Sequence, residues 1–140
     1  MTFARATLVR DGRNWPLLDH YIGWCGQLGR PDDAVEICRL RLKIDPDNVH
    51  TMQWLAYLLG QRGEFDESLA LIRRRIELDD KNAGAWAILS LDLASQNRFD
   101  EAIPAMRRAT AIQPENQMYR AQLQMLIDVQ KQRGEADPTQ

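Results

Sequence analysis

The chain has 140 residues, of which 44% are hydrophobic and 27% charged, and its 18 basic and 20 acidic side chains leave a formal charge of −2. This composition is typical of one globular domain rather than of a collagen-like or disordered chain, and the near-neutral charge argues against a nucleic-acid partner. No run of 18 apolar residues occurs, so we expect no membrane span. The N-terminal segment lacks the apolar core of a secretory signal. We therefore expect a cytoplasmic protein, or a soluble domain of a larger assembly.

A period of 34 residues organises the sequence. Asparagine, aspartate and small residues recur at this spacing, and a period of this size is the signature of a stacked helical repeat. The recurring positions are Asn14, Asn48, Asn82 and Asn116, then Asp32, Asp66 and Asp100, and then Ala34, Ser68 and Ala102. This register predicts three repeats, over about 15–48, 49–82 and 83–116.

Residues 3–13 align in phase with the second helix of the later repeats and have no partner helix before them. We interpret this segment as half a repeat. Three roles stay open for it: it caps the stack, it pairs with another copy of the chain, or it frays as chain termini often do.

The first repeat is expected to hold two helices. Pro16 suits the first turn of a helix, where its missing N–H costs little, and Gly29 suits a left-handed turn at the end of that helix. Pro31 then starts the second helix. The two cysteines, Cys25 and Cys38, each lie on an apolar helical face and are most simply buried thiols. A disulfide between them stays open as an alternative, because the two helices would bring them close.

The second and third repeats follow the same pattern, with turns expected at Gly63 and Asn97. A final helix over 117–132 has one apolar and one polar face, which is typical of a capping helix. Residues 134–140 carry glycine, proline and charge and are expected to be a disordered tail. We therefore expect a single domain over residues 1–133.

These patterns resemble the tetratricopeptide repeat (TPR) family, whose signature is W-x2-L-G-x2-Y, then A-x3-F, then P. Repeat three fits it best, with Trp86, Leu89, Ser90, Leu93, Ala102, Met106 and Pro114. Ile22 and Asp80 depart from it, the first where a small residue is usual and the second where proline is usual. The resemblance implies an all-α fold, a right-handed α-solenoid of three helix pairs with an N-terminal half-repeat helix and a C-terminal capping helix.

In this family the first helices of successive pairs line a concave groove, and the resemblance implies that a partner binds there. The matching positions are His20, His50, Gln53, Trp54, Tyr57, Ile88, Leu91, Met118, Gln122 and Met125. They are mainly aromatic and apolar, and the basic residues with which some relatives clamp a carboxylate are missing. The sequence thus predicts a protein or peptide partner with an apolar segment, held by aromatic anchors. The alternative is that this stripe packs between repeats, as apolar stripes at helical spacing usually do.

A column of arginines on the second helices is a second candidate site. Its members are Arg39, Arg73 and Arg107, with Arg41, Arg74, Arg75 and Arg108 beside them. An acidic partner or nucleic acid would fit such a stripe, but interleaved acids favour a solvated face with cations near helix C-termini. The two histidines lie in no cluster with metal-ligand spacing, and no phosphate loop or catalytic motif is present. We expect no metal site, no cofactor and no enzyme activity.

We therefore predict a non-catalytic protein-interaction module, an adaptor or chaperone-like protein that holds an apolar helical or extended segment of a partner in its groove. The alternative is a self-assembling scaffold, a homodimer formed through the half repeat at residues 3–13 or through the open ends of the stack.

Overall fold

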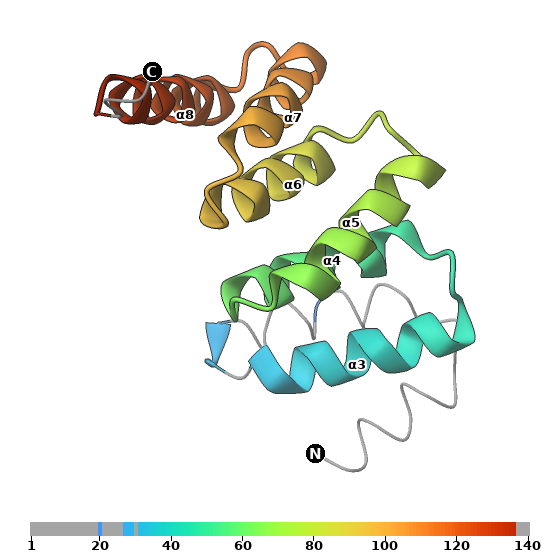
Figure 1. Cartoon of the computed structure of the whole chain (residues 1–140). Helices are drawn as coiled ribbons and strands as arrows, with labels where there is room; N and C mark the ends of the chain where they lie inside the picture. The colour runs from blue at the N-terminus through green and yellow to red at the C-terminus, as the bar shows by residue number, and fades with distance from the viewer. Residues whose placement is uncertain (1–19, 21–26, 30, 137–140) are drawn as a thin grey trace. The chain divides into compact units, whose positions relative to one another are not determined.

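The computed structural model describes residue 20, residues 27–29 and residues 31–136 (Figure 1). The helices described are α3 (Pro31–Ile44), α4 (Val49–Gln61), α5 (Phe65–Leu78), α6 (Ala83–Ser95), α7 (Phe99–Ile112) and α8 (Gln117–Ala136). The chain divides within α5 into two compact units, 1–71 and 72–140, and each is described by itself. The half repeat over residues 3–13, most of the first helix of repeat one and Cys25 lie outside the described residues, so what was predicted of them stays a prediction.

Asparagine side chains begin the first helices of the repeats. In Asn48 and Asn82 the Oδ1 atom accepts a hydrogen bond from the backbone N–H three residues on, at 2.9 and 3.0 Å. Asn116 makes the same bond at the start of α8, at 3.2 Å. The first N–H groups of a helix have no partner inside it, and asparagine is among the residues that satisfy them best. The asparagine column of the sequence is therefore a set of N-caps that starts α4, α6 and α8.

The turns fall at the expected residues and share one backbone conformation. Gly29, Gly63 and Asn97 have φ values of 68°, 78° and 62°, which is the left-handed region that glycine enters freely and asparagine more readily than other residues. These three residues are spaced by one repeat length. Gly63 and Asn97 therefore reverse the chain between the two helices of repeats two and three, and Gly29 adopts the same conformation shortly before α3.

Serine hydroxyls join the two helices of a pair at their closest approach. In repeat two, Oγ of Ser68 on α5 donates to the carbonyl oxygen of Ala56 on α4 at 2.7 Å. In repeat three, Oγ of Ser90 on α6 donates to the carbonyl oxygen of Ala102 on α7 at 2.6 Å. All four residues are completely buried. A serine side chain is short, so these hydrogen bonds can form only where the two helix backbones lie close together. The recurring small residues, Ala56, Ser68, Ser90 and Ala102, therefore mark the helix crossings.

Each unit has an apolar core of its own. In the first unit α3 packs on α4, through Ala34, Val35, Ile37, Cys38, Leu55, Leu58 and Leu59. In the second unit α6, α7 and α8 share a core made of Ala83, Ala87, Ile103, Met106, Ala109 and Leu126. Helix α8 adds Tyr119, Leu123 and Ile127 from the same side, and it continues to Ala136, beyond the expected end near residue 132. No helix within the described ranges is long and apolar enough to cross a membrane.

Two arginines of the predicted stripe are buried. The prediction that they lie on an exposed face was therefore wrong. Arg41 is 5% exposed and Arg75 is 2% exposed. Arg75 lies seven residues after Ser68, on the buried side of α5, and Arg41 has the same relation to Ala34 on α3. Residues seven apart share one face of a helix, so these two arginines follow the core side. Their long apolar stems make such burial tolerable when the charged end finds a partner.

Candidate functional site

Helix α4 turns one side into the core and leaves an aromatic side outside it. Met52, Leu55, Ala56 and Leu59 are buried. The residues that we call the aromatic face, His50, Gln53, Trp54 and Tyr57, follow the i, i+3, i+4, i+7 spacing of the other side. Trp54 is 37% exposed and Tyr57 46% exposed, with their rings edge to face and the ring centroids 6.3 Å apart. Two large aromatic side chains thus stand together at the surface of the first unit.

Helix α8 presents a comparable surface in the second unit. The residues that we call the methionine face are Met118, Gln122 and Met125, again at i, i+4, i+7. Met118 is 59% exposed and Met125 54% exposed, while Gln122 is half-buried. The opposite side of α8 is polar, with exposed Gln124 and Asp128 joined by a 2.9 Å hydrogen bond. Only one outer flank of this helix is therefore apolar.

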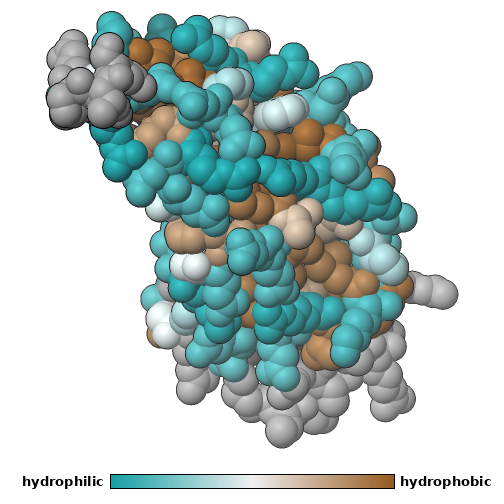
Figure 2. Space-filling view, in the orientation of Figure 1, coloured by the Kyte–Doolittle hydropathy of each residue, from teal (hydrophilic) through white to brown (hydrophobic). Residues whose placement is uncertain are grey.

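The remaining predicted groove residues are distributed as follows. On α6, Leu91 is 38% exposed and Ile88 is half-buried. His20 and His50 are exposed, and no group of three histidine, cysteine or acidic side chains within the described ranges is arranged to hold a metal ion. The aromatic face belongs to one unit, and Leu91 with the methionine face belongs to the other, so their union in a single groove stays a prediction. Figure 2 shows that hydrophobic patches interrupt a largely hydrophilic surface.

Asp92 is a buried acidic residue that the sequence reasoning missed. It follows the exposed Leu91 on α6 and is only 6% exposed, and it is the one aspartate or glutamate buried in the described part of the chain. Helix α6 has buried residues on most of its sides, among them Ala83, Ala85 and Leu89. The available signal was that Asp92 is the single charged residue in an otherwise apolar helix. Aspartate is seldom buried in proteins unless it is paired, so this signal alone did not predict its burial.

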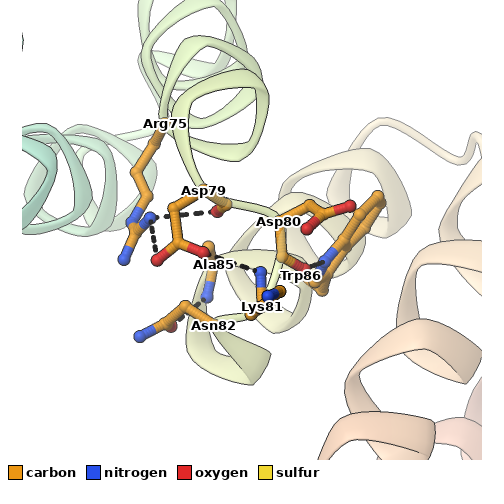
Figure 3. Close-up of polar contacts among 7 residues, drawn as sticks. All are labelled: Arg75, Asp79, Asp80, Lys81, Asn82, Ala85 and Trp86. Carbon is orange, nitrogen blue, oxygen red and sulfur yellow. Dashed lines mark hydrogen bonds and ion pairs between the residues drawn. The ribbon is translucent and has the colours of Figure 1, made fainter.

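A polar network fixes the turn between α5 and α6 (Figure 3). Arg75 donates to the carbonyl oxygen of Asp79 at 3.1 Å, and the Asp79 carboxylate accepts the backbone N–H of Lys81, also at 3.1 Å. That backbone hydrogen bond is the main cause that lowers the pKa of Asp79; Arg75 adds to it, while partial burial acts in the opposite direction. The buried Arg75 is therefore satisfied by the end of its own helix.

Trp86 closes the same turn from the α6 side. Its indole Nε1–H donates to the carbonyl oxygen of Asp80 at 2.8 Å (Figure 3), and the guanidinium of Arg108 lies 5.3 Å from its ring centroid. Arg108 also approaches the Asp80 carboxylate at 3.8 Å. An open hollow is lined by these residues with Leu78 and Lys81. Because Trp86, Asp80 and Arg108 are engaged with one another, we interpret the hollow as a structural feature of the turn.

Acidic side chains pair with the exposed arginines of the predicted stripe. Arg39 on α3 meets Glu67 on α5 at 2.9 Å. Arg73 on α5 meets Glu101 on α7 at 3.9 Å. These pairs link one second helix to the next and reduce the positive charge of the stripe. They favour the interpretation of a solvated face over that of a binding site for an acidic partner.

Comparison with known proteins identifies the fold. Residues 83–116 match the tetratricopeptide repeat family. MamA is 22% identical, with a TM-score of 0.79 over 94% of this chain and 77% of that chain. The first TPR of Spaghetti (RPAP3), bound to the HSP90 peptide SRMEEVD, is 15% identical, with a TM-score of 0.79 over 86% of this chain and 96% of that chain.

A further similarity concerns part of a larger protein. The O-GlcNAc transferase of Thermobaculum terrenum is 23% identical over 91% of this chain, with a TM-score of 0.75, but this chain spans only 23% of the transferase. No curated protein matches by sequence. At these identities the similarities show the fold alone. They confirm the predicted all-α helical repeat and the resemblance to TPR proteins.

Proposed function

Because the chain has the TPR fold and carries a matching repeat at residues 83–116, we propose that it is a non-catalytic protein-interaction module. It holds an apolar segment of a partner protein on the outer faces of its first helices. The observation that carries the proposal is the exposure of Trp54, Tyr57, Leu91 and the methionine face beside well-filled cores. Exposed apolar side chains that gather on one side of an element commonly mark binding surfaces.

The chemistry of these faces suits an apolar guest. Aromatic residues are enriched among the positions that dominate binding energy, and methionine adapts its shape to different ligands because its side chain is unbranched and flexible. Within the TPR fold, RPAP3 supplies an example of a domain with a bound peptide, SRMEEVD. This precedent supports peptide binding as the mode of action.

An acidic peptide of that kind is not the partner we propose. The aromatic face and the methionine face contain no lysine or arginine, and Trp54 and Ile88 stand where carboxylate-clamping relatives carry polar or basic residues. We therefore expect no measurable binding of SRMEEVD in a calorimetric titration at moderate salt. Micromolar affinity for this peptide would contradict the apolar assignment.

The direct test compares two double variants of the full chain as baits in a pull-down, with the captured proteins identified by mass spectrometry. Trp54→Ala with Leu91→Ala removes two exposed apolar side chains from the proposed faces. The matched control, Ile44→Ala with Leu78→Ala, removes two exposed apolar side chains elsewhere, at 52% and 40% exposure. We expect proteins captured by the wild type to be lost with the first variant and kept with the control. Equal capture by both variants would refute the proposal.

Self-assembly is the second candidate function, and its strongest support in the sequence is the half repeat at residues 3–13. On α8 the outward side is polar, with Arg120, Gln124 and Asp128 exposed, which disfavours stacking through that end. Light scattering of the chain with and without residues 1–13 tests the remaining route. A monomer in both preparations would remove the dimer hypothesis, and a dimer that dissociates on deletion would establish it.

A further inference from the structure

Helix α8 occupies the place of the first helix of a fourth repeat. It begins with the cap of Asn116, as the first helices of repeats two and three begin with theirs. Gln130 near its end donates to the Asp100 carboxylate at 2.6 Å. Two repeat lengths earlier, Arg62 pairs with Asp32 at 3.3 Å. Within the described ranges no second helix follows α8, so its outward side has no partner of the kind that α4 and α6 have.

The burial of equivalent leucines shows what such a partner covers. Those of α4 and α6 have exposed fractions of 8% or less: Leu55, Leu59, Leu89 and Leu93. The second helix crosses beside them, at Ala56 and at Ser90. One repeat length later, Leu123 and Ile127 on α8 are only half-buried, although both touch the core of the second unit. The difference is apolar surface that a second helix would cover, and its burial favours binding.

Polar residues surround this apolar surface. Gln124 lies between the two half-buried residues and has the column position of Ala56 and Ser90. Arg120 and Lys131 are exposed at three-turn spacing on the same side. We call the outward face the side of α8 formed by Arg120, Leu123, Gln124, Ile127, Asp128 and Lys131. It combines a short apolar stripe with two cations at its ends.

An arginine of α7 lies at the edge of the same vacant position. Arg39 meets Glu67 on the next second helix, and Arg73 meets Glu101 on the one after that. In both cases the acid belongs to the first turn of its helix. Arg107 is the next arginine of this column; it is exposed, and no acidic side chain of the described residues pairs with it. A further second helix would therefore bring the acid of its first turn to Arg107.

We propose that the outward face binds an amphipathic helix of a partner protein, with an acidic residue in its first turn paired to Arg107. The partner helix takes the place beside α8 that α5 takes beside α4 and α7 takes beside α6. Its apolar side covers Leu123 and Ile127. Arg120 and Lys131 favour further acidic residues along its flanks. This surface is separate from the aromatic face and the methionine face, so the inference goes beyond the proposed function.

A second copy of the chain is a poor source for this helix. The second helices α5 and α7 have acidic first turns, but they are already held against α4 and α6 by buried contacts. Freeing one of them would expose the core of its own repeat. A separate protein that carries an acidic helix has no such cost. A peptide as short as SRMEEVD does not form a stable helix, so the expectation for that peptide is unchanged.

The experiment uses a synthetic peptide that copies residues 64–80, with both ends blocked, because α5 is the chain's own example of such a helix. The peptide has six acidic and three basic residues. It is titrated into the full chain labelled with ¹³C in the methyl groups of leucine, isoleucine and methionine. We expect the methyl signals of Leu123 and Ile127 to shift, while those of Met118 and Met125 stay in place.

Charge reversal tests the predicted ion pair. Arg107→Glu should weaken binding of the peptide about 5-fold, the upper end of what an exposed pair contributes. A peptide with Glu67→Arg should regain that affinity for this variant. Lys43→Glu is the matched control, because it makes the same change of charge at an exposed position of α3 and should leave binding unchanged. Gln124→Ala should strengthen binding, since it gives α8 the small residue that a close helix crossing requires.

Every other outcome overturns the inference. If the peptide shifts the signals of the methionine face instead, it binds there, and the proposed function stands without the outward site. Equal weakening by Arg107→Glu and Lys43→Glu would reduce the contact to general charge attraction. If the outward-face signals shift when the chain is concentrated without peptide, the occupant is a second copy. An absence of any shift at millimolar peptide would remove the site, and the pull-down test of the proposed function would remain unaffected.

Discussion

Repeats two and three make the same contact from opposite sides. In the α4–α5 pair the serine is on the second helix, and in the α6–α7 pair it is on the first, yet each hydroxyl reaches a carbonyl oxygen of the facing helix at 2.6–2.7 Å. The turns differ in a similar way, with Gly63 in one and Asn97 in the other at nearly the same φ. The repeat therefore specifies a distance and a backbone conformation, and more than one residue can meet each requirement.

The largest loss of stability is expected at the core position that is isoleucine in repeat two and methionine in repeat three. Ile72 and Met106 are one repeat length apart and both are 0% exposed. Replacement of either by alanine should lower the free energy of unfolding by about 3 kcal/mol, because each leaves a cavity. Urea denaturation measures the loss, with Leu78→Ala, at an exposed position, as the control. If one of the two variants were as stable as the control, the repeats would not be equivalent in their cores.

Exchange of the serine between the helices tests the equivalence directly. Ser68→Ala should cost about 1 kcal/mol, the usual contribution of one hydrogen bond. Adding Ala56→Ser to that variant gives repeat two the arrangement of repeat three and should restore most of the loss. The reciprocal pair, Ser90→Ala with Ala102→Ser, should behave alike in thermal unfolding. If neither double variant regains stability, the hydroxyl can form its hydrogen bond only from the helix on which it occurs naturally, and the short distance between the helices is not sufficient.

The turns should respond to substitution by a similar or smaller amount, and in a graded order. Gly63→Ala places a side chain at a φ of 78° and should cost about 1 kcal/mol, although no atom lies within 4 Å of the added carbon. Gly63→Asn should cost less, since Asn97 holds the same conformation one repeat later. Melting temperatures of the two variants give the comparison. An asparagine variant that is less stable than the alanine variant would contradict it.

The smallest effect concerns the start of α7. A hydrogen bond from Arg98, at 2.6 Å, is the main cause that lowers the pKa of Glu101 below its ordinary value of 4.5, with Arg73 contributing and partial burial opposing. A carboxylate with a lowered folded-state pKa stabilises the fold above the unfolded value, and this contribution disappears as the pH falls through the folded-state value. Stability should therefore decrease below pH 4.5, and Glu101→Gln should flatten part of that decrease. An unchanged pH profile would show that the pair contributes nothing.

The sequence was sufficient for the positions that repeat. The turns and the small residues at the helix crossings were predicted from their recurrence. The asparagines were recognised as a recurring column, and their role as N-caps came from the structure. Arg75 could not be placed in this way, because its partner is the carbonyl oxygen of Asp79 at the end of the helix, and a charged residue at a core-facing position is indistinguishable in the pattern from an exposed one. The burial of Asp92 could likewise not be predicted, because aspartate is usually exposed. The exposed positions of α4 and α8 follow from helical spacing, whereas their role in binding a partner stays a prediction.

The two exposed methionines of α8 also determine how the chain should meet an oxidant. Met52 and Met106 are enclosed, whereas Met118 and Met125 present more than half of their surface to solvent. Oxidation to the sulfoxide turns a flexible apolar side chain into a polar and chiral one. Among the four methionines of the described residues, peroxide should therefore modify Met118 and Met125 first. The cores stay intact, while the surface proposed to hold a partner loses its apolar character. Methionine sulfoxide reductase would reverse the oxidation. We therefore expect partner capture to decrease after peroxide treatment and to return after treatment with the reductase.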